Sequence, residues 1–353
     1  MTNANPIEID GAMGEGGGQV LRSSLSLAAV TGQAVRIHRI RANRAKPGLM
    51  RQHLTAVLAA ARVSNAEVEG ATVGSTELTF TPGARVADDA DAPPLHLELS
   101  VGTAGSTTLV LQTILPILLT SRAAAFVKIE GGTHNPMAPP FDFLVRSFLP
   151  LIARMGRAVD ARLVRHGFYP AGGGVLEVRV PAKPTGGLLE PIEILERGED
   201  RARRARALLV NLPRSIGERE VKVVCDRLRW RAEWCEVAVL GDTPGVGNVL
   251  HLEVESEALT EVVTAFGERG VTAEKVAERA VAEVKHYLAA GVPVGEHLVD
   301  QLLLPMALAG GGAFRTLALS RHAATNIEVI RAFLDVAIVV EADDRHTATV
   351  RIG

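Results

Sequence analysis

The sequence has few cysteines, few aromatic side chains and no long apolar run. Its two cysteines, Cys225 and Cys235, are ten residues apart, which is not the spacing of a metal-binding or redox pair. We therefore expect free thiols and a reducing compartment. Residues 1–6 are polar and unlike a signal peptide, and no apolar run reaches the roughly 18–20 residues that cross a bilayer. These absences predict a cytoplasmic protein that does not enter a membrane.

The bulk composition is that of an ordinary globular chain. Aromatic residues make up 4% of the 353 residues, hydrophobic residues 47% and charged residues 22%. This favours aliphatic packing of helices on sheets, and the length suffices for two or three domains. The net charge is −2, so a nucleic-acid partner would have to bind a local basic patch.

One order of elements, strand–helix–strand–helix–strand–strand, recurs three times. In the first copy the expected elements are residues 7–10, 20–30, 35–40, 49–61, 66–69 and 77–81. The second copy has strands 96–99, 125–130, 158–164 and 175–180, a helix that follows 102–106, and a helix at 141–155. The third has a helix that starts near 294, a strand at 313–319, a helix at 324–333 and strands 336–342 and 347–352. Such self-similarity indicates an internal repeat.

The spacing of the copies locates an insertion. Ser24 and Gln112 occupy corresponding places 88 residues apart, whereas Gln112 and Gln301 are 189 residues apart, so about 100 extra residues separate the second and third copies. These extra residues predict a β-α-β-β-α order at 207–211, 216–228, 233–240, 250–255 and 273–289. An α/β segment of that length can fold alone.

We therefore predict an α/β fold with layered helices and sheets. Its large domain would comprise repeats one and two in residues 1–185 and repeat three in residues 291–353. A smaller inserted α/β domain would occupy residues 186–290.

Two segments near the N-terminus suit a phosphate-rich ligand. Residues 14–19 (Gly-Glu-Gly-Gly-Gly-Gln) precede a helix, where backbone amides can approach an anion, and Glu15 beside such a site suits a divalent metal. A tight structural turn is the alternative. Residues 36–53 carry Arg, Lys and His but no acid. A basic run is usually a solvated face, but arginine matches phosphate geometry, and a phosphate-rich substrate is the better explanation of this segment.

Three further segments are ambiguous on composition alone. Residues 165–174 could simply be a turn that leads into a strand, and residues 131–143 a loop that leads into a helix. His322 follows an expected strand and could be a nucleophile or a structural histidine. Residues 128–131 (Lys-Ile-Glu-Gly) are similar to the Lys-x-Asp-Gly motif of lysine-adenylating ligases. They have Glu in place of Asp and lie at a strand end, so we set them aside.

Taken together, these segments resemble the RNA 3′-terminal phosphate cyclase family. The segments that carry the resemblance are 14–27, 41–54, 102–113, 131–143, 165–174, 294–312 and 322–329. The resemblance implies a ligase that forms a phosphoric ester bond. It would use ATP and a divalent metal, Mg²⁺ or Mn²⁺, to convert an RNA 3′-terminal phosphate to a 2′,3′-cyclic phosphate through histidine–AMP and RNA-3′-pp-5′-A intermediates. AMP and pyrophosphate would be released, and no obligate protein partner is indicated.

The resemblance also implies roles for individual residues. His322 would be the nucleophile and Glu15 the metal ligand. Phosphates would be held by Arg22, Arg41, Arg44 and Gln52. The adenosine would lie among Gln112, Pro139, Phe143, His297, Leu298, Val299, Asp300 and Gln301.

Two positions depart from the family pattern or lack a role in it. His297 stands where relatives often have a tyrosine against the adenine, so we expect weaker stacking there. Arg321 precedes His322, and our hypothesis is that it helps to hold phosphate. Unchanged adenylation and cyclisation in Arg321→Ala would contradict that hypothesis.

Three other interpretations remain at this point. A ribosome-biogenesis relative would share the fold without adenylation, but His322, Asp300 and Gln301 are all present. An enolpyruvyl transferase would have six repeats in about 420 residues rather than three repeats and an insert. A simple RNA-binding scaffold would bind through the basic run in a salt-dependent way without consuming ATP.

Overall fold

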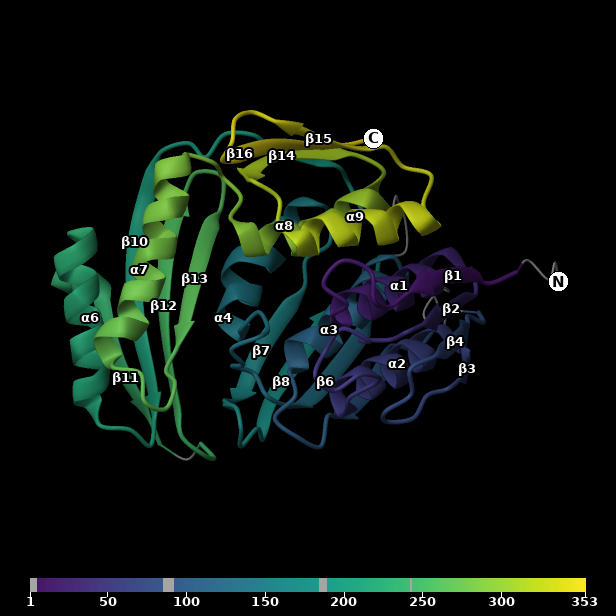
Figure 1. Ribbon diagram of the computed structural model, residues 1–353, viewed down its shortest axis with the longest axis horizontal. Coiled ribbons are helices and arrows are strands. Elements are labelled where there is room, and N and C mark those ends of the chain that lie inside the picture. Colours follow the sequence, from purple (N-terminus) through teal and green to yellow (C-terminus); the bar gives the residue numbers. More distant parts are fainter. Residues whose placement is uncertain (1–4, 85–91, 184–188, 242) are drawn as a thin grey trace.

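The chain folds into four small sheets with helices packed on them. The computed structural model describes residues 5–84, 92–183, 189–241 and 243–353, and these contain four four-stranded sheets. Each sheet combines parallel and antiparallel neighbours, which confirms a mixed α/β fold (Figure 1). Among these residues no helix is both long and apolar enough to cross a membrane.

Three of the sheets have the same strand arrangement. Counted along the chain, the first two strands of each sheet are parallel to each other. The fourth strand lies between the second and the third and is antiparallel to both. In spatial order, the first sheet is β1 (Ile7–Asp10), β2 (Val35–His38), β4 (Leu78–Thr81) and β3 (Glu67–Glu69). The second is β5 (Leu95–Ser100), β6 (Ala125–Gly131), β8 (Gly174–Val180) and β7 (Asp160–Arg165). The third is β9 (Ile192–Ile194), β14 (Gly312–Leu317), β16 (Thr347–Ile352) and β15 (Ile338–Ala342).

The helices of these three sheets meet in the centre of the molecule (Figure 1). They are α1 (Gly18–Thr31), α2 (Arg51–Ser64), α3 (Thr107–Leu119), α8 (Glu296–Ala309) and α9 (Arg321–Phe333). Helix α1 packs against α2, α3 and α9, and α9 packs against α8. Leu25, Ile114 and Ile330 belong to the single core that results. Because α1 is surrounded, its polar side chains need partners inside the protein, and Ser26 donates to the carbonyl of Thr113 at 2.7 Å.

The fourth sheet has a core of its own. Its strands are β11 (Cys235–Leu240), β10 (Asp200–Val210), β12 (Gly247–Ser256) and β13 (Thr260–Phe266), and its helices are α6 (Arg214–Leu228) and α7 (Ala273–Ala290). Val224, Leu252 and Val284 belong to a core cluster that joins the two helices to one face of the sheet. Strand β13 contacts α4 (Phe141–Phe143) and the π-helical turn after it. The fourth sheet therefore lies against the helical segment that follows β6 of the second sheet.

The expected helix at 141–155 is interrupted. It consists of α4, a π-helical turn (Leu144–Phe148) and α5 (Leu149–Arg154). Pro150 lies at the start of α5, and its missing amide proton removes a helical hydrogen bond, which favours a wider turn before it. The start of α9 is also earlier than expected, because Ser320 caps the helix ahead of Arg321.

The fourth sheet contains more strand than the sequence suggested. Strand β13 was not predicted, and its burial pattern shows no clean alternation. Strand β10 begins at Asp200, inside a charge-dense run, and further along it Ala205 and Ala207, on either side of Arg206, belong to the core of this sheet.

Strand β9 lies inside residues 186–290, which we had assigned to the insert, yet it pairs in parallel with β14. Three residues are too few to show a period in the sequence.

Candidate active site

His322 lies in the first turn of α9, where two helices begin near one another. The hydroxyl of Ser320 accepts a hydrogen bond from the Ala323 amide at 3.2 Å and so starts the helix. Helix α1 begins close by, since a Cβ on Gly17 would be 3.9 Å from His322 Cε1. Neither helix has an acidic residue in its first turn, so the positive ends of both favour an anion at this place.

The glycine-rich segment before α1 packs tightly against α9. Gly14 and Gly16 both have φ of +58°, a conformation that favours glycine. A Cβ on Gly14 would lie 1.8 Å from Thr325 Oγ1, so a side chain there would push α9 away. The segment is thus a tight turn, and it holds Glu15, which lies between the two glycines, at the start of α9.

Glu15 connects His322 to the basic run. Its Oε2 is 2.9 Å from His322 Nε2 and 3.5 Å from Arg44 Nη2. The three side chains are between 36% and 42% exposed, so a ligand from solvent can reach them. An imidazole, a carboxylate and a guanidinium therefore meet beside two helix starts, which is a set of groups suited to phosphoryl chemistry.

Arg41 stabilises the loop that carries these cations. Its Nη1 donates to the carbonyl oxygens of Lys46 and Gly48 at 2.7 and 3.0 Å. Burial, together with repulsion from Arg44, lowers the pKa of Arg41. Positive charge is thus concentrated beside Glu15 and held there by the loop's own backbone.

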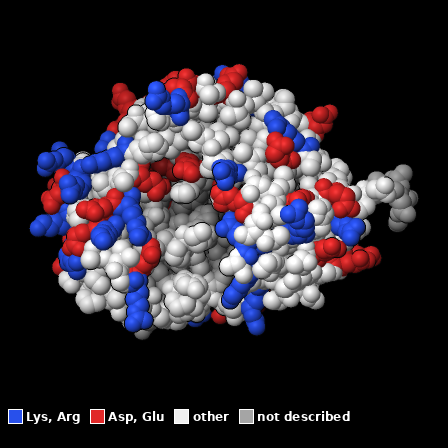
Figure 2. Space-filling model, in the orientation of Figure 1, with Lys and Arg blue, Asp and Glu red and all other residues white. Residues whose placement is uncertain are grey.

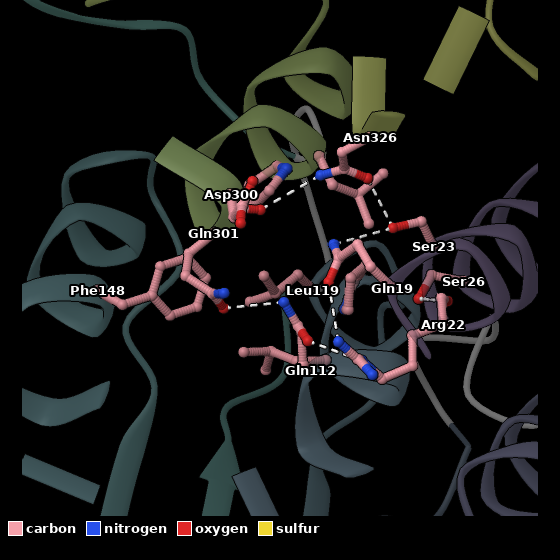
Figure 3. A pocket seen from close by; sticks show the side chains of 14 residues that line it. Gln19, Arg22, Ser23, Ser26, Gln112, Leu119, Phe148, Asp300, Gln301 and Asn326 are labelled. Carbon is pink, nitrogen blue, oxygen red and sulfur yellow. Dashed lines mark hydrogen bonds between the residues drawn. The ribbon is translucent and has the colours of Figure 1, made fainter. Parts of the chain in front are cut away.

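A part-buried series of hydrogen bonds connects three helices at the centre of the molecule. Arg22 Nε donates to Gln112 Oε1 at 2.9 Å, and Gln112 Nε2 donates to Gln301 Oε1 at 3.1 Å. Figure 3 shows these side chains converging from α1, α3 and α8. Burial lowers the pKa of Arg22 to about 10, so its guanidinium remains charged at neutral pH. The series places a fixed positive charge next to two amides.

Asp300 lies beside this series of hydrogen bonds and lacks a full set of partners. Burial raises the pKa of Asp300 to about 6, although the charge of His322 opposes that rise. Its Oδ1 is buried and has no hydrogen-bond partner among the described residues. Because an unpaired buried acceptor is costly, this oxygen is suited to a hydroxyl donor on a ligand.

Two narrow cavities border the contact between Gln112 and Gln301. One, of about 20 Å³, is also lined by Asp300 and Arg22. The other, of about 10 Å³, is also lined by Pro139 and Phe143. Gln112 and Gln301 line both cavities, and a hydrogen bond joins their side chains. The structure thus brings together Gln112, Pro139, Phe143, Asp300 and Gln301.

Other predicted residues are engaged elsewhere. Gln52 Oε1 accepts from the Ser106 amide at 2.6 Å, directly before α3. The His297 side chain is 68% exposed, and its Nε2 is 3.6 Å from Glu283 on α7. Leu298 and Val299 are buried in the main core, so their side chains support α8 from within.

One residue beside the site, His53, ends the basic run but was given no role of its own from the sequence. His53 is buried, its Nδ1 accepts from the Met50 amide at 3.1 Å, and its Nε2 lies 2.5 Å from where a Cβ on Gly18 would be. Burial, with Arg22 and Arg41 nearby, lowers the pKa of His53 to about 3, so it is neutral. The available signal was its place at the end of the basic run, directly after the start of α2.

Comparison with known proteins agrees with this geometry. The RNA 3′-terminal phosphate cyclase family matches residues 13–340. A protein of Ectopseudomonas mendocina named RNA 3′-terminal phosphate cyclase is 48% identical over 344 residues, which is 97% of each chain. A protein of that name from Pseudomonas fluorescens is 50% identical over 332 residues, which cover 94% of this chain and 93% of the relative.

The chain belongs to the RNA 3′-terminal phosphate cyclase family. The resemblance found in the sequence is thereby confirmed, and membership of this family replaces the enolpyruvyl transferase interpretation. Every predicted site residue of this cyclase-family chain, from Glu15 to His322, lies within the matched range.

Proposed function

We propose that this protein uses ATP to convert the 3′-terminal phosphate of an RNA to a 2′,3′-cyclic phosphate. The relatives named as cyclases match it over nearly its whole length. The observation that carries the proposal is the 2.9 Å contact between His322 and Glu15 beside the starts of α1 and α9. It supports a phosphoryl-transfer site with a nitrogen nucleophile.

In the first step, His322 Nε2 attacks the α-phosphorus of ATP. A P–N bond forms, the bond from that phosphorus to the bridging oxygen breaks, and pyrophosphate leaves. Nε2 lies 2.9 Å from Glu15 Oε2, so a proton on Nε2 would first pass to the Glu15 carboxylate, and the freed lone pair would then turn from Glu15 to the phosphorus. Arg44, Arg41 and Arg22 together with the two helix starts would stabilise the negative charge of the transferring group.

In the next steps AMP moves to the RNA. An oxygen of the 3′-phosphate attacks the histidine-bound phosphorus and releases the imidazole, which gives an RNA-3′-pp-5′-A end. The vicinal 2′-hydroxyl then attacks the former 3′-phosphate, loses its proton, closes the ring and expels AMP. Adenylation is needed because an unmodified phosphate oxygen is a poor leaving group.

The residues present fit a divalent metal bound together with phosphates. Glu15 is a part-exposed carboxylate beside an anion-binding position, and Mg²⁺ commonly uses one or two carboxylates plus substrate phosphates. Glu15 would hold such an ion, Mg²⁺ or Mn²⁺, which would supply neutralisation of phosphate charge.

For the nucleoside, we propose a site formed by the two cavities at Gln112 and Gln301. Exchanging their mutual hydrogen bond for bonds to the base would open the space towards Pro139 and Phe143. Asp300 would then receive a ribose hydroxyl at its unpaired oxygen. Because each polar group would gain a new hydrogen-bond partner for the one it loses, opening this space would cost little free energy.

We also propose that the large domain consists of three copies of one strand–helix–strand–helix–strand–strand unit. The fourth sheet would be an insert in the third copy. The identical pairing order of the three sheets supports this. Because β9 pairs with β14, the insert would begin after β9, near β10, rather than at residue 186. The large domain would then comprise residues 1–185, β9 and residues 291–353.

The test is covalent labelling with α-phosphate-labelled ATP and magnesium, followed by a denaturing gel. The samples are the wild type, His322→Ala and Lys128→Ala, whose lysine is exposed on β6 and serves as a matched control. We expect label on the wild type and on Lys128→Ala and none on His322→Ala. The labelled protein should then pass AMP to an RNA with a 3′-phosphate.

Two outcomes would contradict the proposal. Label that persists in His322→Ala would move the nucleophile to another residue. A folded wild type without label would favour a non-catalytic relative that binds RNA through its basic run.

A further inference from the structure

A second cluster of metal-binding side chains lies between the second and fourth sheets. His134 follows β6, Asp142 lies in α4, and His251 lies in β12. One ligand atom from each lies within 4.8 Å of the others. His134 and Asp142 are eight residues apart, whereas His251 is more than 100 residues further along the chain, and none of the three was assigned a role from the sequence.

The spacing of these atoms suits a tetrahedral ion. Asp142 Oδ2 is 3.1 Å from His134 Nε2 and 3.5 Å from His251 Nε2. Zinc–nitrogen and zinc–oxygen distances of about 2.0–2.2 Å place neighbouring tetrahedral ligands about 3.3–3.6 Å apart. The observed distances are therefore close to those of ligands that share one ion.

The nitrogen of His251 points to a missing partner. Its side chain is only 1% exposed, and Nε2 has no hydrogen-bond partner among the described residues. A buried nitrogen left unpaired costs free energy. A cation between His251 and Asp142 would satisfy that nitrogen and the carboxylate together.

The outer nitrogens of both rings are already fixed. His134 Nδ1 is 2.9 Å from Thr133 Oγ1, and His251 Nδ1 is 3.2 Å from Thr264 Oγ1. Hydrogen bonds of this kind orient metal-binding imidazoles. Both rings therefore turn their Nε2 atoms towards Asp142 without rearrangement.

Solvent reaches the cluster at Asp142. The ring of Phe168 stacks on His134 with centroids 4.9 Å apart, while the Asp142 side chain is 18% exposed, so water can reach the cluster. Arg206 pairs with His251 across β10 and β12, and its Nε is 3.5 Å from Glu236, which offsets its charge.

We propose that His134, Asp142 and His251 bind one divalent transition-metal ion with water as its fourth ligand. Two imidazoles and one carboxylate suit Zn²⁺, Co²⁺ or Ni²⁺, whereas Mg²⁺ and Ca²⁺ prefer oxygen ligands alone. The ion would link β12 of the fourth sheet to α4 and the loop after β6. This site is separate from Glu15 and does not depend on the proposed reaction.

The experiment is equilibrium dialysis of the full chain against Zn²⁺ without ATP, and against Co²⁺ with its visible spectrum recorded. His322→Ala serves as the background, because it removes the imidazole beside Glu15 as a competing ligand. We expect one ion per chain, a tetrahedral Co²⁺ spectrum and a Tm that rises with Zn²⁺. His134→Gln, Asp142→Asn and His251→Gln should each lose the ion, whereas His96→Ala, which changes an exposed histidine on β5, should retain it.

A milder change covers the case in which a ligand variant fails to fold. Thr264→Val keeps the ligands and the side-chain volume but removes the hydroxyl next to His251, and we expect about 10–100-fold weaker binding. Absence of bound ion in the His322→Ala background would overturn the proposal. Equal binding by that background and by the same protein with His251→Gln added would also overturn it, and the cluster would then be a hydrogen-bonded contact only.

Discussion

At the residue scale, the site contains a carboxyl group that burial keeps in an unfavourable state. The pKa of Asp300 is raised to about 6 by burial, so the folded protein holds this proton to a higher pH than the unfolded chain does. The stability contributed by Asp300 therefore falls as pH rises from about 4 to about 6. At neutral pH the protein retains an ionised group with an unpaired oxygen.

We expect Asp300→Asn to be more stable and less active. The change should raise the free energy of unfolding at pH 7 by about 1–3 kcal/mol and flatten its pH dependence between about pH 4 and 6. Loss of a charged acceptor for the ribose should lower kcat/KM for adenylation roughly 10–100-fold. Chemical denaturation across pH and single-turnover adenylation measure the two effects, and normal adenylation would contradict the proposed role.

Individual residues were predictable to different degrees. The family resemblance indicated His322 and Glu15, and they lie 2.9 Å apart. The bond from Arg22 to Gln112 joins residues 90 positions apart, and no local pattern in the sequence specifies such a pair. The neutral state of His53 depends on burial and on two arginines, which only the folded chain brings together.

At the element scale, the start of α9 holds His322, the proposed nucleophile. The side chain of Ser320 caps that helix start by accepting from the Ala323 amide. Strong caps contribute about 0.5–2 kcal/mol, and fraying of the first turn would displace His322, which is the second residue of the helix. The position of the imidazole therefore depends on one hydroxyl.

We expect Ser320→Ala to lose about 0.5–2 kcal/mol of stability and to slow adenylation by more than this loss of folded protein explains. The matched control is Thr272→Ala, because Thr272 caps α7 in the same way, by accepting from the Lys275 amide at 3.3 Å. The control should lose similar stability and keep the wild-type rate of adenylation. Equal effects of the two changes on adenylation would show that the cap does not position His322.

Elements with a clear period or cap were predictable, and short or crowded ones were not. Strand β16 has the predicted bounds, since its apolar residues alternate next to a turn. Strand β9 has three residues, and its pairing with β14 is specified by the rest of the sheet. Pro150 favours the π-helical turn before α5, but the proline alone does not specify that the interruption takes this form.

At the scale of the whole molecule, a buried acid links the fourth sheet to the helix beside the site. Glu261 in β13 accepts a hydrogen bond from the Gly295 amide, at the start of α8, at 2.9 Å. Burial raises the pKa of Glu261 to about 8. Since the folded state keeps this proton and the unfolded chain releases it near its ordinary pKa, stability falls as pH rises from about 4.5 to about 8.

We expect Glu261→Gln to remove much of that dependence. The amide mimics the protonated acid, so the variant should gain about 2–4 kcal/mol over the wild type near pH 8 and differ little near pH 4.5. Glu218→Gln, at an exposed pair with Arg214, should change stability by less than about 0.5 kcal/mol at either pH. Parallel pH curves for Glu261→Gln and wild type would contradict the assignment.

The pairing of β9 with β14 has a consequence for synthesis on the ribosome. The chain emerges from its N-terminus, and domains generally fold as they appear. The first two sheets are complete in sequence before β9 is made, but β9 precedes its partner β14 by the length of the fourth sheet and its helices. The backbone N–H and C=O groups of β9 must therefore stay without their strand partner until nearly the whole protein has been translated.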